Sequence, residues 1–167
     1  VVPLFERLGI RVHACITGDA RFHQVASAHR SRVNMMVCST ALINLARKME
    51  ERYDIPFFEG SFYGIEDTSI ALRTVAKLLV ERGAPATLLE RTETLIASEE
   101  ARAWERIRAF TPRLAGKRVL LYTGGVKSWS IVSALMEMGM VVVNTSVRKS
   151  TPEDKQRIIQ IMKEDAH

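Results

Sequence analysis

The sequence predicts an α/β fold made of Rossmann-like units, in which parallel sheets are flanked by helices. Short apolar runs, such as residues 33–37 (VNMMV) and residues 119–122 (VLLY), alternate with longer segments whose apolar residues recur at helical spacing. A run that is apolar throughout is typical of a strand with both faces covered, as in a parallel sheet. Because this alternation starts again late in the chain, two incomplete units joined by a helix are expected.

The first unit is expected over residues 1–84, as a partial Rossmann-like domain. Its helix over residues 40–53 places apolar side chains on one face and polar residues such as Lys48 on the other. Gly83 is a natural stop for the last helix of the unit. The expected order is the tail of a helix, a strand over residues 11–16, a short helix over 21–29, a strand over 33–37, the helix over 40–53, a strand over 55–58 and a helix over 66–82.

A long charged helix within residues 85–116 is expected to connect the two units. Pro85 suits its first turn, and its apolar pattern continues to Phe110, before Pro112. The second unit, over residues 117–167, is expected to be the truncated start of another Rossmann-like domain. Its elements are expected to be a strand over residues 119–122, a turn at Thr123, Gly124 and Gly125, a helix over 128–138, a strand over 140–145 and a helix that begins at Thr151 and Pro152.

The composition is that of an ordinary globular protein and excludes several classes. Hydrophobic residues make up 47% of the chain and charged residues 26%. No apolar run approaches the roughly 18 residues that a membrane helix needs, and no signal-peptide pattern is present. The 2 cysteines make no disulfide framework, so a cytoplasmic protein is expected. The net charge of +5 comes from basic residues scattered among acidic ones, which favours solvated helix faces over nucleic-acid binding.

Cys38 is the residue whose position most favours a chemical role. It follows the strand expected over residues 33–37 and precedes a helix for which Ser39 and Thr40 are candidate caps. Ligands of parallel α/β sheets bind outside the carboxyl ends of the strands, and a helix N-terminus favours the thiolate, the form that binds metal. Burial in the core is the alternative, because free cysteines are among the most buried residues. Without a CxxC motif or a cysteine cluster, other ligands of a cluster have to come from elsewhere.

Gly124 and Gly125 follow the strand over residues 119–122 and form the turn into the next helix. Glycines at such a turn let backbone N–H groups approach an anion or a sulfide closely, and Lys127 adds a positive charge. Neither GxGxxG nor GxxxxGK[ST] is present, so nucleotide binding has no fingerprint in its favour. A tight turn with a purely structural role explains the glycine pair at least as well.

Other residues carry weaker signals. The loop at residues 57–63 combines aromatic residues with glycine, and it suits either the wall of a cofactor pocket or the cap of a core. The histidines have no metal-ligand spacing, and His29 lies among arginines, as expected at a surface. Cys15, inside the first expected strand, is expected to be buried in the core. No nucleophile–base pair or pair of carboxylates indicates catalysis.

The sequence resembles the nitrogenase component 1 superfamily over essentially its whole length. The resemblance is carried by residues 16–64 (ITGDARFHQVASAHRSRVNMMVCSTALINLARKMEERYDIPFFEGSFYG) and by the later blocks GKRVLLYTGGVKSWSIVSALMEMGM and KSTPEDK. It implies a fold of the nitrogenase component 1 type and a much longer parent chain. Within the superfamily, the resemblance is to non-catalytic scaffold subunits, on which the iron–molybdenum cofactor is assembled from an iron–sulfur precursor before transfer to the catalytic component.

The resemblance also implies roles for particular residues. Cys38 falls on the cysteine that ligates the cofactor, Gly124 and Gly125 match the glycine pair whose backbone lies against the cluster, and Lys127 occupies a position that is Arg in the catalytic α subunit. The implied partners are a homologous scaffold subunit in an α2β2 heterotetramer, a radical-SAM protein that donates the precursor and the nitrogenase iron protein. A [4Fe–4S] cluster at the subunit interface is implied as well, with ligands outside this sequence.

Departures from the family pattern help to choose among the alternatives. Catalytic α subunits carry a Ser three residues after the ligating cysteine, whereas this sequence has Ala41 there, and Lys127 replaces an Arg. A site that releases its cargo needs fewer contacts around the cluster, so both departures favour a scaffold. The catalytic α subunit of nitrogenase, or a related iron–sulfur reductase, is the alternative. A plain nucleotide- or sugar-binding Rossmann domain is a third.

Overall fold

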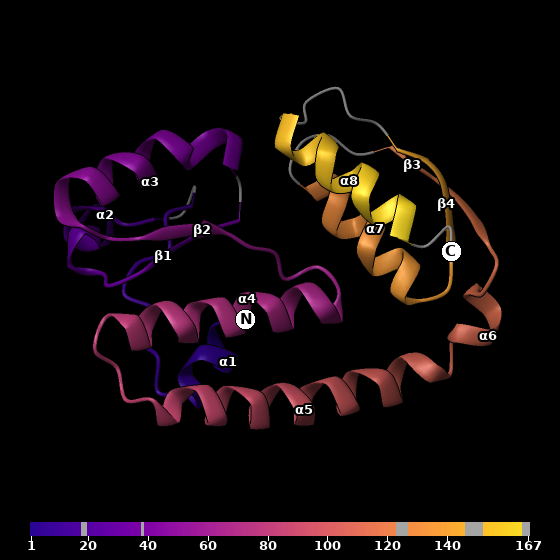
Figure 1. The fold of residues 1–167 in the computed structure, drawn as a ribbon, viewed down its shortest axis with the longest axis horizontal. Coiled ribbons are helices and arrows are strands. Elements are labelled where there is room, and N and C mark those ends of the chain that lie inside the picture. The colour runs from indigo at the N-terminus through magenta and orange to yellow at the C-terminus, as the bar shows by residue number, and fades with distance from the viewer. Residues whose placement is uncertain (18–19, 38, 123–126, 146–151, 165–167) are drawn as a thin grey trace.

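Small parallel sheets organise the chain (Figure 1). The computed structural model describes residues 1–17, 20–37, 39–122, 127–145 and 152–164. Within these residues, β1 (Asn34–Met36) pairs with β2 (Phe57–Glu59), and β3 (Arg118–Leu121) pairs with β4 (Val141–Thr145). Both pairs are parallel. The predicted α/β class, with parallel sheets flanked by helices, is therefore confirmed.

The first sheet is covered on both of its faces. Helix α3 (Ser39–Tyr53) connects β1 to β2, and Asn34 donates a hydrogen bond from its amide to the Met49 sulfur on this helix at 3.6 Å. Successive residues of a strand point to opposite faces. Met35 and its register partner Phe58 accordingly pack against a hydrophobic core on the other face.

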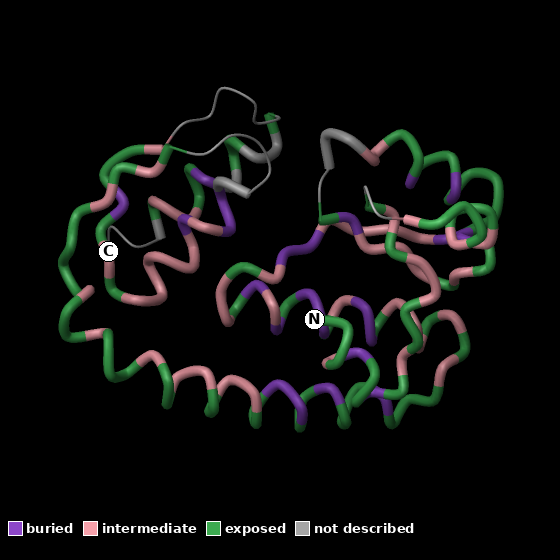
Figure 2. Tube along the Cα trace, turned by 180° about the vertical axis from the view of Figure 1, so that it is seen from behind, coloured by how far each residue is buried: buried purple, intermediate pink, exposed green. Residues whose placement is uncertain are grey.

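That core joins α1 (Val2–Arg7), α4 (Ile65–Glu81) and α5 (Thr87–Arg108). Buried positions run along α4 and the first part of α5, as Figure 2 shows. The first half of the predicted connecting helix is therefore also part of a core, while the domain boundaries at residues 84 and 116 stay predictions. The buried members of the cluster are Phe5, Leu8, Leu72, Val75, Ala76, Leu88, Leu95 and Ile96.

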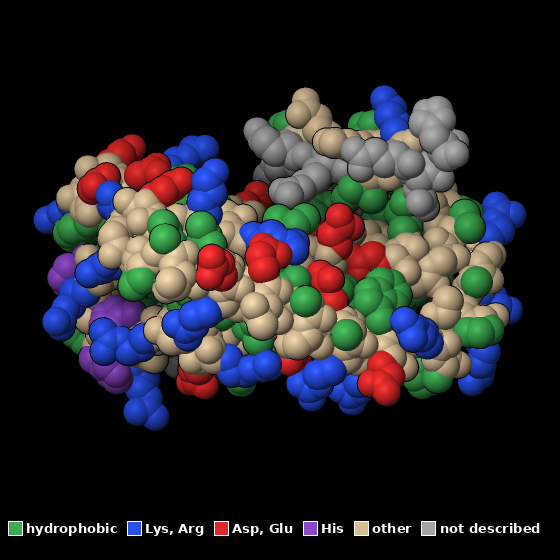
Figure 3. Space-filling model, turned by 60° about the horizontal axis from the view of Figure 1, so that its bottom comes forward, with side chains coloured by type: hydrophobic (Ala, Val, Ile, Leu, Met, Phe, Trp, Pro, Cys, Tyr) green, Lys and Arg blue, Asp and Glu red, His purple; other side chains and the backbone are tan. Residues whose placement is uncertain are grey.

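Polar contacts tie α4 to α5 outside this core. Arg73 donates two hydrogen bonds to the carboxylate of Glu93, both at 2.8 Å, and Ser69 donates one to Glu100 at 2.6 Å. Basic and acidic side chains are interspersed over the molecular face shown in Figure 3. The charged residues of α5 thus form local pairs on a solvated surface, as expected for a helix with one buried side.

Helices α7 and α8 of the second unit lie on one side of its sheet (Figure 1). Helix α6 (Thr111–Leu114) leads into β3, α7 (Lys127–Glu137) connects β3 to β4, and α8 (Pro152–Glu164) follows β4. Trp129 and Val132 of α7 are buried, together with Val142 of β4 and Ile158 of α8. Leu120 on the other face of the sheet is 67% exposed, which shows that this face is open to solvent.

Most predicted elements are present, with ends within a few residues of the expected ones. Gly83 follows α4 with a φ of +87°, and Ala84 donates to the Leu79 carbonyl at 2.9 Å, so the predicted helix stop is confirmed. The short helix expected over residues 21–29 is α2 (Phe22–Ser27) followed by the 3₁₀ turn η1 (Ala28–Arg30). Helix α6 was not expected, and it contains Pro112 in its first turn, where proline is tolerated.

The strand predicted over residues 11–16 is wrong. These residues form no strand, and Cys15 is exposed rather than buried in a core. The segment runs along η1 and α3 without a neighbouring strand to complete a hydrogen-bonded ladder, which a β-strand requires. It is held instead by side chains, including a contact of 2.9 Å between the His13 ring nitrogen Nε2 and the Ser27 carbonyl.

Candidate functional site

The predicted ligand Cys38 belongs to the short connection from β1 to α3. Strand β1 ends at Met36 and α3 begins at Ser39. The predicted order of strand, cysteine and helix is therefore present along the chain. Cys38 itself lies outside the described residues, as do the side chains of residues 39–41, so its role as a ligand stays a prediction.

The end of β2 lies beside this connection. Met36 is the register partner of Glu59, and the Met36 carbonyl accepts a hydrogen bond from the Gly60 N–H at 2.9 Å. Glu59 has one carboxylate oxygen, Oε1, shielded from solvent. Ser61 is buried, and its hydroxyl oxygen accepts from the Tyr63 N–H at 3.1 Å. Polar side chains thus sit at the carboxyl edge of the first sheet, where parallel sheets bind ligands.

Glu59 and Ser61 were not predicted from the sequence as polar residues at this edge of the sheet. The sequence marks the loop at residues 57–63 by its aromatic residues and glycine, and two of the aromatic residues cap the core, which is one of the two roles expected for the loop. Phe58 and Phe62 pack against it, and the rings of Phe5 and Phe62 meet edge to face with centroids 5.9 Å apart. The signal for Glu59 was its place at the end of a short apolar run.

The second predicted group belongs to the connection from β3 to α7. Strand β3 ends at Leu121 and α7 begins at Lys127. Gly124 and Gly125 lie between them in the chain and outside the described residues. Lys127 is described only as the first residue of the helix, without its side chain. Trp129 and Ser130, each 2% exposed, anchor the first turn of α7 in the core of the second unit.

The helices that follow the two connections, α3 and α7, begin on sides of the units that face each other. In Figure 1 the first turn of α3 and the first turn of α7 lie on the facing sides of the two units, above α4. The view from behind in Figure 2 shows the same arrangement. The starts of α3 and α7 are therefore the described elements nearest in sequence to the predicted ligands, and they face each other.

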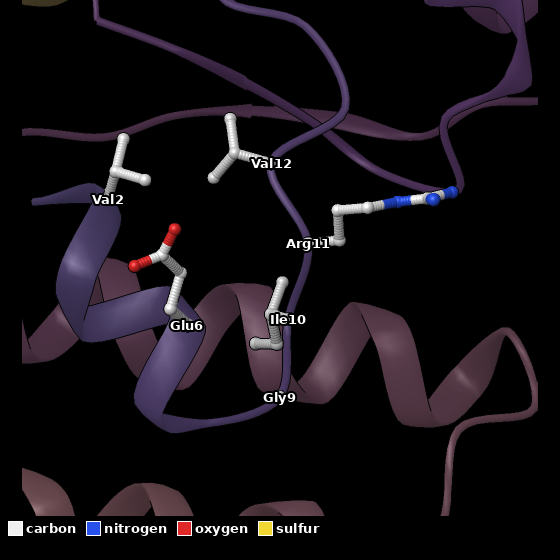
Figure 4. A pocket seen from close by; sticks show the side chains of 6 residues that line it. All are labelled: Val2, Glu6, Gly9, Ile10, Arg11 and Val12. Carbon is white, nitrogen blue, oxygen red and sulfur yellow. The ribbon is translucent and has the colours of Figure 1, made fainter.

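Other candidate sites in the described residues are weaker. No group of three or more His, Cys, Asp or Glu residues is placed to hold a metal ion within the described ranges. A pocket of about 270 Å³ lies between α1 and residues 10–12. In Figure 4 the Glu6 carboxylate points between Val2 and Val12, whereas Arg11 points away from the pocket. This pocket includes no residue of either connection. In the described part of the chain, no helix is long and apolar enough to cross a membrane.

The parallel strand–helix–strand units, with candidate ligands at strand ends, define a Rossmann-like α/β protein. The comparison with known families is more specific. The chain belongs to the nitrogenase component 1 type oxidoreductase family, whose model matches residues 1–167.

Several relatives are similar over essentially the whole chain. The chain is 69% identical over 167 residues to the nitrogenase iron-molybdenum cofactor biosynthesis protein NifE of Mesorhizobium japonicum. It is 62% identical to the protein of the same name in Rhodobacter capsulatus, over 167 residues, and 54% identical to that of Klebsiella pneumoniae, over 166 residues. The chain spans about a third of the length of these relatives, 34% in the first case and 35% in the other two.

A solved structure supports the fold. The structure described as nitrogenase Cp1 at pH 6.5 matches with a TM-score of 0.83 and 26% sequence identity. The match covers 98% of this chain and 32% of that chain. The arrangement of sheets and helices described above is therefore that of nitrogenase component 1 proteins.

Proposed function

We propose that this chain is part of a scaffold subunit on which the iron–molybdenum cofactor of nitrogenase is assembled from an iron–sulfur precursor. The observation that carries the proposal is the identity of 54% to 69% with proteins named for the biosynthesis of this cofactor. That similarity extends over 99% or more of the chain in each case, so it includes both connections that carry the candidate site.

The candidate residues fit a cargo held by few ligands. Cys38 supplies one thiolate beside a helix start, and the backbone N–H groups of Gly124 and Gly125 suit the sulfides of a cluster. A lysine ammonium, as at position 127, is a point charge with rotatable donors, whereas a planar guanidinium binds its partners in a fixed geometry. We infer that these residues bind and then release the precursor, and that the chain is a scaffold rather than an enzyme.

A permanent [4Fe–4S] cluster does not fit this chain alone. Such a cluster is held by four thiolates, whereas the chain has 2 cysteines. The ligands of the proposed interface cluster therefore come from other parts of the polypeptide or from its partner. The proposed partners are the homologous scaffold subunit NifN in an α2β2 heterotetramer, the nitrogenase iron protein and the radical-SAM precursor donor, all in the cytoplasm.

The alternative is the catalytic α subunit of nitrogenase or a related iron–sulfur reductase. The fold match to a nitrogenase structure favours this class, but its identity of 26% is far below the identity with the biosynthesis proteins. The full-length purified complex distinguishes the two. Transfer of a cluster to cofactor-free nitrogenase supports the scaffold, whereas substrate reduction with the iron protein and ATP supports the enzyme.

The ligand role of Cys38 is tested by Cys38→Ala in the full-length complex, with Cys15→Ala as the matched control. We expect Cys38→Ala to lower the precursor iron that is retained by about tenfold or more, because even the loss of outer contacts weakens metal sites by about 10–100-fold. Cys15→Ala should retain iron as the wild type does, since Cys15 is exposed and belongs to neither connection. Equal iron in the two variants, measured on intact heterotetramers, would contradict the ligand role.

A further inference from the structure

Glu137 makes a polar contact between the two units. It is the last residue of α7, and its carboxylate lies at the first turn of α4. Oε2 accepts a hydrogen bond from the Ile65 N–H at 2.8 Å, and Oε1 accepts one from the Glu66 N–H at 3.2 Å. A residue of the second unit therefore caps the helix that supports the first sheet.

No side chain at the N-cap of α4 caps this helix, and the Glu137 carboxylate accepts from its first N–H groups instead. The N-cap of α4 is Gly64, which has no side chain to cap the helix and adopts a φ of +87°. A Cβ atom at position 64 would lie 2.9 Å from Glu137 Oε1 and 3.2 Å from the Cβ of Ala134. Glycine is thus required both by its backbone conformation and by the close approach of α7. The first N–H groups of a helix need partners from outside it, and the carboxylate provides two.

Opposing effects act on the pKa of Glu137. The positive end of a helix favours a carboxylate, and the N–H groups of Ile65 and Glu66 act to lower its pKa. Burial acts in the opposite direction and is the largest cause, so the pKa of Glu137 is raised. The nearby charges of Glu66 on α4 and Glu100 on α5 add to that rise.

The two helices joined by this contact, α7 and α4, are each connected along the chain to one of the two connections of the candidate site. Helix α7 is 11 residues long, and its other end, about 15 Å away at 1.5 Å per residue, begins at Lys127 beside the glycine connection. Position 65 follows directly on the loop from β2, whose end is hydrogen-bonded to the end of β1 before Cys38. Because a helix is stiff, a contact at the last turn of α7 constrains the direction of its first turn.

We propose that Glu137 is a positioning residue that fixes the second unit on the first and thereby sets the spacing between the connections that carry Cys38 and the glycine pair. The part of this proposal that concerns the precursor rests on the scaffold function proposed above. The placement of α7 on α4 does not depend on that function, and it has a measurement of its own.

The test compares Glu137→Ala, Glu137→Gln and the control Glu105→Ala in the full-length complex. Hydrogen exchange, followed by mass spectrometry, is measured on peptides that cover residues 61–68 and 127–137. Glu137→Ala leaves the N–H groups of Ile65 and Glu66 without their acceptor, so both peptides should exchange several-fold faster. Glu137→Gln keeps one carbonyl acceptor and should restore most of the protection. Glu105 is exposed on α5, and its replacement should change neither peptide.

Retained precursor iron and its electron paramagnetic resonance spectrum provide the second measurement. Glu137→Ala should lower the iron and broaden the spectrum, and Glu137→Gln should restore both. Val75→Ala in the first core destabilises the protein by another route, and it should leave the spectrum unchanged. A purely structural role predicts the same spectrum for Val75→Ala and Glu137→Ala at matched stability, and that result would overturn the proposal.

The outcomes also separate the two proposals. If the wild-type complex retains no precursor iron, the scaffold function fails, while exchange of residues 61–68 still tests the contact. If Glu137→Ala does not fold, Glu137→Asp replaces it, because a carboxylate shortened by one methylene cannot keep both hydrogen bonds. Exchange in Glu137→Asp equal to that of the wild type would overturn the positioning role.

Discussion

The two sheets of this molecule are both parallel pairs of short strands, but they have different surroundings. In the first, Met35 and Phe58 face a core of helices while Asn34 reaches α3 on the opposite face. In the second, Val142 is 7% exposed on the side of α7 and α8, whereas Leu120 on the other side is 67% exposed. An apolar run therefore indicates a strand whose two faces are both suited to burial. It does not show whether both faces are covered by the helices of this stretch of chain.

The largest expected effect compares equal truncations in the two units. Leu72→Ala removes a side chain that is 2% exposed in the first core, and we expect a loss of about 2–5 kcal/mol in the free energy of unfolding. Leu120→Ala, the matched control on the open face, should cost less than about 0.5 kcal/mol. Urea denaturation measures both. A similar cost for the two variants would mean that another layer covers the outer face of β3–β4 in solution.

The next effect is the pH dependence of the stability that Glu137 contributes at the contact between the units, and its sign follows from the raised pKa. The folded pKa of Glu137 is raised above its ordinary value of 4.5, so the ionised carboxylate is disfavoured in the folded state. The stability that this group contributes is therefore fully present below pH 4.5 and is lost as the pH rises through the folded pKa.

We accordingly expect the wild type to gain stability relative to Glu137→Gln as the pH is lowered from 7.5 toward 5. Chemical denaturation at several pH values measures this difference. A difference that stays constant with pH would show that Glu137 is not desolvated at the contact. A difference of the opposite sign would show that the helix N-terminus outweighs burial.

The smallest expected effect is at the surface of the first unit. Glu93 has its pKa lowered, first by the hydrogen bonds from Arg73, so the stability that it contributes is present above its ordinary pKa of 4.5 and is lost as the pH falls through the lower, folded value. Because the pair is exposed, Glu93→Gln should cost about 1 kcal/mol or less at neutral pH. Thermal unfolding in low and high salt measures it, and a cost unaffected by salt would contradict a screened surface pair.

Much of the fold follows from local patterns. The apolar run at residues 33–37, the helical spacing over 40–53 and the stop at Gly83 each correspond to an element or an end in the structure. These signals are local, because periodicity and turn residues act within a few positions. The strand expected over residues 11–16 failed for the opposite reason, since a strand depends on a partner that the segment itself does not reveal.

The candidate site was predictable only in part. The strand–residue–helix order around Cys38 is readable from the chain, whereas its ligand role came from a family resemblance and lies beyond the described residues. The contact of Glu137 with Ile65 joins positions 72 residues apart, and no local pattern marks it. Gly64 stands just before the helix expected over residues 66–82, and no local pattern shows why glycine is needed there, because the carboxylate that approaches it comes from the other unit.

Gly60 limits which substitutions the end of β2 tolerates. A Cβ atom there would lie 2.6 Å from the Met35 Cε atom and 2.8 Å from the Phe58 Cε2 atom. Gly83, by contrast, has open space around it and is constrained only by its backbone angle, which asparagine also tolerates. A side chain at position 60 therefore requires the tip of Met35 and the ring of Phe58 to move, and both side chains pack against the first core. A side chain at position 83 displaces no neighbour, so the end of β2 tolerates substitution less well than the end of α4.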